Sequence, residues 1–182
     1  MPQFIAFLRA INVGGHTVKM ERLRHLFESL EFTNVETFIA SGNVIFETSS
    51  QNTKALETQI ETMLNDNLGY EVATFITTPT EVAAVATYQP FSEKEIATAQ
   101  ALNVGFISDD LDQPAQERLM ALKTNIDDFH VHNRVIYWVC QKKQSESTFS
   151  NAVFEKTLKQ KSTWRGINTI KRLAAKYPPS PK

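Results

Sequence analysis

Two hairpin patterns lie far apart in this chain and occupy the same place in its order of predicted elements. In residues 35–47, the turn Ser41-Gly42-Asn43 separates two runs of β-branched and aromatic residues. In residues 129–140, the turn is Asn133-Arg134. Each hairpin follows a predicted strand and helix and precedes another helix. The pattern therefore predicts two halves of similar order.

Hydrophobic periodicity predicts the other elements. The strands are 3–11, 70–77 and 102–107, and the helices are 19–30, 52–68, 79–87, 92–101, 114–123, 150–159 and 168–176. The first half then reads β-α-β-β-α-β, which is typical of a ferredoxin-like unit. We predict an α+β fold of two ferredoxin-like subdomains. Internal duplication is one explanation of the two halves, and the other is that ferredoxin-like arrangements recur without common ancestry. Residues 1–78 form the N-terminal subdomain, 79–101 a helical connector, and 102–182 a C-terminal α+β subdomain with a basic last helix.

Two helix ends carry strong local signals. Thr78-Pro79-Thr80-Glu81 has a cap residue, a proline at the first helical position and a glutamate that completes a capping box. Gly69 follows the helix predicted for 52–68, where a left-handed C-terminal cap is expected.

Length and composition predict a cytoplasmic protein without a membrane segment. A chain of 182 residues buries about 70% of the surface that its unfolded form exposes, so it needs no disulfide or metal for stability. Its one cysteine, Cys140, has no intrachain partner. The N-terminus lacks the charged leader of a secretory signal, and no apolar run approaches the ~20 residues of a membrane helix.

A strand, a glycine turn and the start of a helix follow one another in residues 4–19. Arg9, Asn12, Gly14, Gly15 and Lys19 cluster at this strand end. Glycines allow backbone N–H groups to approach a ligand closely, and a helix N-terminus presents unpaired donors. These residues predict an anion site. The spacing matches neither a phosphate loop nor a dinucleotide fingerprint, and a tight turn with glycines for geometry is the alternative.

Three further residues join the predicted site if the fold brings them near. Ser41 and Asn43 offer a hydroxyl and an amide at the hairpin tip, although turn chemistry alone explains both. Arg165 lies just before the last predicted helix, which Asn168 or Thr169 would cap, and its charge suits an anion.

The remaining reactive residues do not define a reaction. His130 and His132 share a strand face, but no third ligand has metal-site spacing, so we predict no metal and no cofactor. Cys140 follows apolar residues and has no neighbouring base in the sequence. No nucleophile or general base is identified, and the sequence leaves open whether the protein is an enzyme.

The chain resembles a bacterial family, the domain of unknown function 1697. The resemblance rests on residues 8–15, on Val18-Lys19-Met20 with Leu23, on residues 38–46, and on the closing motif 163–169. Departures are Ala10 for the family's glycine, Ala40 for glutamine, and Gly166-Ile167 for Asn-Trp. The resemblance implies a two-part α+β fold with ferredoxin-like character and supplies no activity.

Three functional hypotheses follow. The first is binding of a small anionic, phosphorylated ligand at residues 9–19. The second is a nucleic-acid-binding module, because residues 156–182 carry eight of the 19 basic residues and no acidic residue. The third is a protein-interaction module in which all these residues are structural. The sequence lacks an RNA-recognition signature of exposed aromatic residues, which makes nucleic acid the weaker partner.

Overall fold

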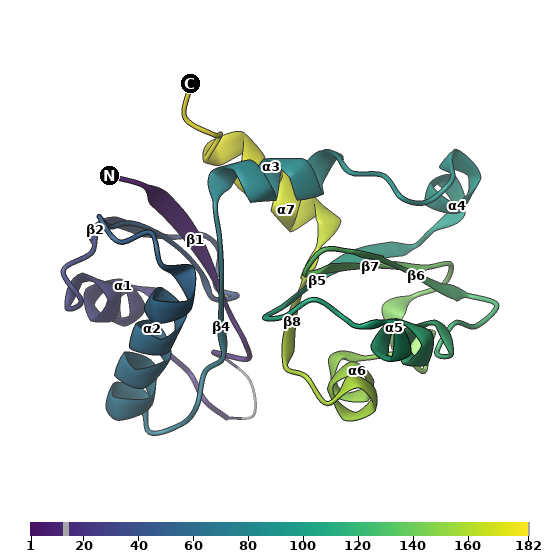
Figure 1. Ribbon diagram of the computed structural model, residues 1–182, viewed down its shortest axis with the longest axis horizontal. Coiled ribbons are helices and arrows are strands. Elements are labelled where there is room, and N and C mark those ends of the chain that lie inside the picture. Colours follow the sequence, from purple (N-terminus) through teal and green to yellow (C-terminus); the bar gives the residue numbers. More distant parts are fainter. Residues whose placement is uncertain (13–14, 182) are drawn as a thin grey trace. The chain divides into compact units, whose positions relative to one another are not determined.

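The computed structural model describes residues 1–12 and 15–181. They form two compact units, Met1–Ala83 with Leu173–Lys182 and Ala84–Arg172. Each unit contains one four-stranded antiparallel sheet, and the described residues include seven α-helices (Figure 1). The predicted α+β class is confirmed. The division at residues 78 and 101 stays a prediction. None of the helices in the described residues has the length and apolar character needed to span a bilayer.

The first unit contains a sheet with the strand order β2-β3-β1-β4. Its elements are β1 (Gln3–Leu8), α1 (Met20–Glu28), β2 (Thr33–Thr37), β3 (Asn43–Glu47), α2 (Thr53–Leu68), β4 (Thr74–Thr77) and the start of α3 (Pro79–Thr87). Strand β1 pairs with both β3 and β4, so it is central, as its apolar faces require.

Helices α1 and α2 cover one face of this sheet (Figure 1). Alternate residues of β1 and β3 point toward them because side chains alternate along a strand. The core consists mainly of the buried residues Phe4, Ala6, Leu8, Leu23, Phe27, Val44, Phe46, Leu56, Ile60 and Leu64. The helical spacing that predicted these two helices therefore corresponds to their buried faces.

The predicted helix ends in this unit are confirmed. Gly69 ends α2 in the left-handed conformation, with φ of 81°. The Thr78 hydroxyl accepts a hydrogen bond from the Glu81 N–H, and the Glu81 carboxylate accepts one from the Thr78 N–H. This reciprocal pair is the capping box expected from the sequence.

The last residues of the chain complete the first unit. Tyr177, the residue after α7 (Ile167–Lys176), is buried, and its hydroxyl donates to Glu36 Oε2 at 2.6 Å. Its ring meets that of Phe38 edge-on at 6.4 Å. The Lys176 ammonium lies 5.7 Å from the Phe38 ring centroid. These contacts fix the C-terminal segment against β2 and the residue that follows it.

The second unit has the strand order β6-β7-β5-β8. Its elements are α4 (Glu93–Thr98), β5 (Ala101–Ile107), α5 (Gln113–Met120), β6 (Asp127–His132), β7 (Val135–Cys140), the 3-10 turn η1 (Gln144–Glu146), α6 (Asn151–Leu158) and β8 (Ser162–Gly166). Residues of α5 and α6 pack on one face of the sheet around Phe129, Ile136 and Trp138. The order β-α-β-β-α-β and the order of strands within the sheet are the same in both units.

Strand β8 is absent from the sequence-based prediction. It pairs with β5, and the Trp164 ring lies over Gly105, where a Cβ atom would come within 2.7 Å of the ring. The sequence of β8 is short and includes an arginine and a glycine, so by itself it has little propensity to form a strand. Its pairing with β5 stabilises the extended conformation. The cap prediction was also wrong, because Asn168 and Thr169 lie inside α7, which begins at Ile167.

Candidate functional site

The loop after β1 is anchored by the side chain of Asn12. Its amide oxygen accepts from the Val18 N–H at 2.7 Å, and its amide nitrogen donates to the Ala40 carbonyl at 3.2 Å. The first bond closes the loop toward α1, and the second joins the loop to the hairpin tip between β2 and β3. The structure therefore brings two of the sequence-predicted segments together.

Tyr70 provides a second anchor for the same loop. The Tyr70 hydroxyl donates to the Ile11 carbonyl at 3.1 Å, and the His16 ring stacks on the Tyr70 ring with 3.8 Å between centroids. Strand β1 ends at Leu8, before the predicted residue 11, because Ala10 adopts φ of 54° and turns the chain. Gly14 lies outside the described residues.

The hairpin tip is built around Gly42 and Asn43. Gly42 has φ of 79°, and its carbonyl accepts from the Leu8 N–H at 2.8 Å. Asn43 is fully buried, and its amide nitrogen donates to the Phe38 carbonyl and to Ser41 Oγ, both at 2.9 Å. These bonds give Asn43 a positioning role in the turn, whereas Ser41 is exposed.

The two predicted cations of this loop differ in environment. Arg9 is half-buried, and its backbone N–H donates to the Ala73 carbonyl at 2.9 Å. Lys19 is exposed and occupies the N-cap position of α1, where its side chain makes no capping hydrogen bond. Gly15 is also exposed, with φ of 85° and open space where a Cβ would lie.

Arg165 belongs to the second unit, on β8. It is buried, and its guanidinium donates to Thr163 Oγ1 at 2.8 Å and to the Trp164 carbonyl at 2.9 Å. Burial lowers the pKa of Arg165 to about 10. Arg165 is therefore absent from the solvent-exposed surface that the nucleic-acid hypothesis assigns to the basic residues of 156–182. Its place in an anion site stays a prediction.

The carboxylate of Asp127 accepts hydrogen bonds from several neighbouring side chains. It is buried, and its carboxylate accepts from Trp138 Nε1 at 2.9 Å, Ser147 Oγ at 2.8 Å and Thr124 Oγ1 at 2.8 Å. Burial alone would raise its pKa, but the hydrogen bonds from these partners outweigh it and hold the pKa below its ordinary value. The ionised Asp127 carboxylate therefore links three separate segments at the hydrophobic core of the second unit.

The other reactive residues do not assemble into a metal centre. No group of three or more His, Cys, Asp or Glu residues suited to a metal ion occurs in the described chain. Cys140 is buried, and this burial raises the pKa of its thiol. A raised pKa keeps the thiol protonated, which is the opposite of what a nucleophilic cysteine requires.

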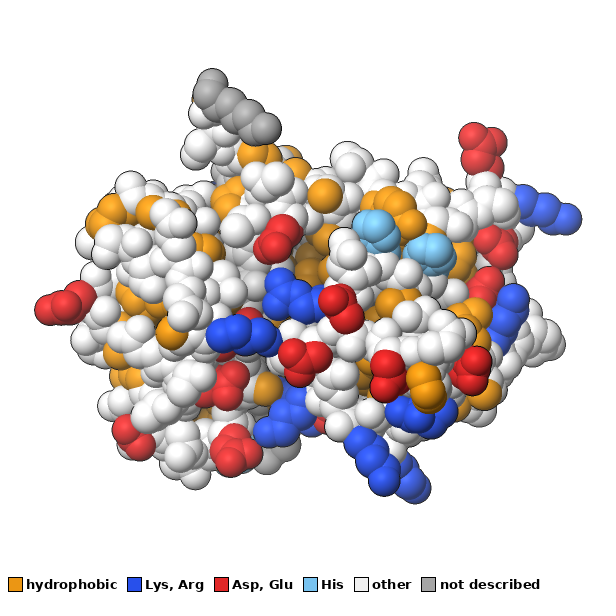
Figure 2. Space-filling model, viewed as in Figure 1, with side chains coloured by type: hydrophobic (Ala, Val, Ile, Leu, Met, Phe, Trp, Pro, Cys, Tyr) orange, Lys and Arg blue, Asp and Glu red, His pale blue; other side chains and the backbone are white. Residues whose placement is uncertain are grey.

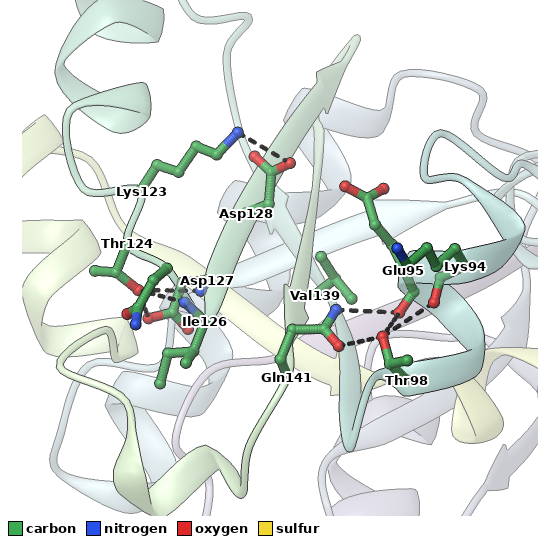
Figure 3. A pocket seen from close by; sticks show the side chains of 11 residues that line it. Lys94, Glu95, Thr98, Lys123, Thr124, Ile126, Asp127, Asp128, Val139 and Gln141 are labelled. Carbon is green, nitrogen blue, oxygen red and sulfur yellow. Dashed lines mark hydrogen bonds and ion pairs between the residues drawn. The ribbon is translucent and has the colours of Figure 1, made fainter.

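A pocket of about 320 Å³ opens in the second unit, between α4 and the β6–β7 hairpin (Figure 3). Its lining comes from three segments, 94–98, 123–128 and 139–141. Lys123 Nζ lies 3.4 Å from Asp128 Oδ2 within this lining. Sequence reasoning missed the pocket because its residues are neither adjacent nor part of a motif.

An aromatic cluster lies further along the β6–β7 hairpin and outside the pocket lining. The Tyr88 ring stacks on His132 with 4.5 Å between centroids and lies 5.3 Å from the Tyr137 ring. The Tyr88 hydroxyl and His130 Nε2 are hydrogen-bonded at 2.9 Å. Burial, followed by the charge of His132, lowers the pKa of His130, while Asp128 opposes this shift. The sequence showed that the two histidines share a face but gave no sign of Tyr88.

The fold and these sites define an α+β protein of two similarly built units. The chain belongs to the family described as Protein of unknown function (DUF1697), whose model matches residues 1–137. The closing motif at 163–169 lies beyond that match. The chain is also similar to a solved structure, the conserved bacterial protein SP0830 from Streptococcus pneumoniae. The two share 19% identity with a TM-score of 0.71, over 96% of this chain and 97% of the other. This likeness concerns the fold. A comparison with curated proteins finds no match.

Proposed function

We propose that the protein binds a small anionic, phosphorylated ligand beside the N-terminus of α1. The observation that carries this proposal is Lys19, a cation at an N-cap position without a side-chain cap. The N-terminus of a helix is itself electropositive and has unpaired N–H donors. A lysine there is unfavourable unless an anion is bound, and Glu21 in the first turn offsets it only partly.

The residues around Lys19 have complementary roles in this proposal. Arg9 adds a second positive charge, the exposed Gly15 offers its backbone N–H, and Ser41 offers a hydroxyl. Asn12 and Asn43 position the loop and the hairpin tip through the bonds described above. The anchoring supports the proposal because a site that is ordered before binding loses less entropy when the ligand arrives.

The test is a serine in place of Lys19. Serine is a favoured cap, so Lys19→Ser should stabilise the first unit by about 1 kcal/mol while weakening anion binding about tenfold. Binding of inorganic phosphate and glucose 6-phosphate is followed through the amide signals of Gly15 and Ser41 in NMR titrations. Lys54→Ser is the matched control, because Lys54 stands at the start of α2, where Asn52 already caps the helix.

A gain in stability together with a loss of phosphate binding would support the site. Unchanged binding in Lys19→Ser, or no shift of Gly15 and Ser41 in the wild-type protein, would refute it. Steep salt dependence of binding to single-stranded nucleic acid, with no effect of phosphate, would favour the second hypothesis instead.

We also propose that both units are ferredoxin-like and arose by duplication. The shared element order and strand order support this, as does the equivalent position of the hairpins at 38–46 and 129–137. The cytoplasm remains the expected compartment, since Cys140 is a free thiol.

A further inference from the structure

Two helices of this chain run across the division between the two units. The division falls between Ala83 and Ala84, inside α3, and between Arg172 and Leu173, inside α7. Helix α3 therefore begins in the first unit and ends in the second, whereas α7 begins in the second unit and ends in the first. The two helices are equivalent in chain order, because each follows the last strand of a sheet, β4 or β8.

A tyrosine follows each of these helices and bonds to the unit in which the helix ends. Tyr177 comes directly after α7, and its hydroxyl donates to Glu36 Oε2 at 2.6 Å. Tyr88 comes directly after α3, and its hydroxyl is hydrogen-bonded to His130 Nε2 at 2.9 Å. In both cases the helix starts in one unit and its tyrosine contacts a residue of the other unit.

The residues that bond to the two tyrosines occupy equivalent places. Glu36 lies on β2 and His130 on β6, and these are the strands at corresponding edges of the two sheets. The preceding residues, Val35 and Phe129, belong to the hydrophobic cores. Because side chains alternate along a strand, Glu36 and His130 point to the opposite face of each sheet. The same kind of contact therefore occurs at the same position in both units.

Aromatic contacts accompany both hydroxyl bonds. The Tyr177 ring meets the Phe38 ring edge-on at 6.4 Å. The Tyr88 ring stacks on His132 at 4.5 Å and lies 5.3 Å from the Tyr137 ring. Figure 2 shows two histidine side chains beside hydrophobic ones on the molecular surface. Tyr177 is 7% exposed and Tyr88 is 37% exposed, so the first unit covers its tyrosine more completely.

Neither helix is long enough to be stable by itself. Helix α3 has nine residues and α7 has ten, and isolated helices shorter than about 12–15 residues are marginal in water. The start of α3 is fixed in the first unit by the capping box of Thr78 and Glu81, and α7 continues directly from β8 in the second unit. Because helix formation is cooperative, loosening one end of such a helix weakens the other end.

We infer that Tyr88 and Tyr177 are reciprocal latches, through which each half of the chain completes the other half. Release of Tyr177 from Glu36 frees the end of α7 in the first unit and thereby loosens the beginning of α7 in the second. Release of Tyr88 from His130 acts in the opposite direction through α3. The latches therefore couple local opening of the two units. This coupling uses no residue of the proposed anion site.

The experiment measures hydrogen exchange of individual backbone amides in the full chain by NMR. Tyr177→Phe and Tyr88→Phe each remove one hydroxyl and keep the ring. Loss of a hydrogen bond of typical strength should raise the opening equilibrium about fivefold. In Tyr177→Phe, exchange should become faster along the whole of α7, including Lys171 in the second unit. In Tyr88→Phe, it should become faster along the whole of α3, including Val82, whose N–H donates to the Thr78 carbonyl in the first unit.

Tyr70→Phe is the matched control, because the Tyr70 hydroxyl donates to the Ile11 carbonyl within the first unit. This variant should speed exchange near the loop after β1 and leave α3 and α7 unchanged. Glu36→Ala removes the bond to Tyr177 from the other side, so it should reproduce the effect of Tyr177→Phe.

Faster exchange at the far end of each helix, together with no effect of Tyr70→Phe there, would support the latches. Faster exchange confined to residues 173–177 in Tyr177→Phe, or to residues 84–88 in Tyr88→Phe, would overturn the inference, because each unit would then open by itself. An equal effect of Tyr70→Phe on α3 and α7 would also overturn it, since any loss of stability in the first unit would then be sufficient.

Discussion

Replacing a glycine by alanine can destabilise a protein in two ways: it can strain a left-handed backbone, and it can push a methyl group into neighbouring atoms. Comparing three glycines of this chain separates these two effects and so measures how tightly the hairpin tip is packed. Gly69 has φ of 81° with nothing within 4 Å of an added Cβ. Gly105 lies outside the left-handed region, but its Cβ would come within 2.7 Å of the Trp164 ring. Gly42 combines both problems, with φ of 79° and a Cβ 2.8 Å from Ile11 Cγ2.

The expected losses of unfolding free energy follow from these contacts. Gly69→Ala should cost about 1–2 kcal/mol, because only the left-handed backbone penalty applies. Gly105→Ala should cost about 1–3 kcal/mol, because the ring must shift to admit the methyl group. Gly42→Ala should cost about 2–5 kcal/mol, the combined range. Leu8 cannot give way easily there, since its backbone carbonyl oxygen is only 3.3 Å from the added atom.

Urea unfolding measures these differences. Circular dichroism follows the whole chain, and tryptophan fluorescence reports the second unit, because both tryptophans, Trp138 and Trp164, lie in it. Gly105→Ala should therefore lower the fluorescence midpoint. If Gly42→Ala lowers the free energy of unfolding no more than Gly69→Ala does, the hairpin tip is not packed tightly on the end of β1. The proposed anion site beside α1 then loses its structural basis.

Two further predictions concern titrating groups in the second unit. Asp127→Asn should cost about 2 kcal/mol at pH 7, where a charged acceptor strengthens its hydrogen bonds. Because the folded pKa of Asp127 is lowered, this contribution is lost as the pH falls through that pKa. Unfolding followed by tryptophan fluorescence should therefore show a smaller difference between the variant and the wild-type protein at pH 3. Equal differences at both pH values would contradict this. The pKa of His130 should lie below 6.5 in an NMR titration, and the stability from its neutral form, present above that pH, should fall as the pH drops through the folded pKa. His132→Ala should raise the His130 midpoint by removing a neighbouring positive charge, and an unmoved midpoint would show that burial alone sets it.

The parts of the fold that the sequence predicted are those with local causes. The turn at Ser41-Gly42-Asn43, the capping box at Thr78 and the cap at Gly69 depend on residues within a few positions of one another. Such signals remain valid whatever packs around them. The two halves were predictable for the same reason, because each hairpin has its own turn chemistry.

The parts that the sequence did not predict depend on distant partners. Strand β8 owes its extended form to pairing with β5 and to the space that Gly105 leaves for Trp164. The pocket joins α4 to two strands that follow much later in the chain. In the proposed anion site, Asn12 was predicted as a ligand residue. Its hydrogen bonds to Val18 and Ala40 depend on how the loop and the hairpin fold together, so the sequence could not show them.

The return of the C-terminus to the first unit has a consequence for synthesis. Residues 1–83 leave the ribosome well before residues 173–182, which belong to the same unit. Until then Glu36 lacks the hydroxyl of Tyr177, and the Phe38 ring lacks its edge-on neighbour. In the nascent first unit, Glu36 and Phe38 therefore lack these contacts while the whole second unit is translated. The final contacts of the first unit form only after residues 173–182 have been translated.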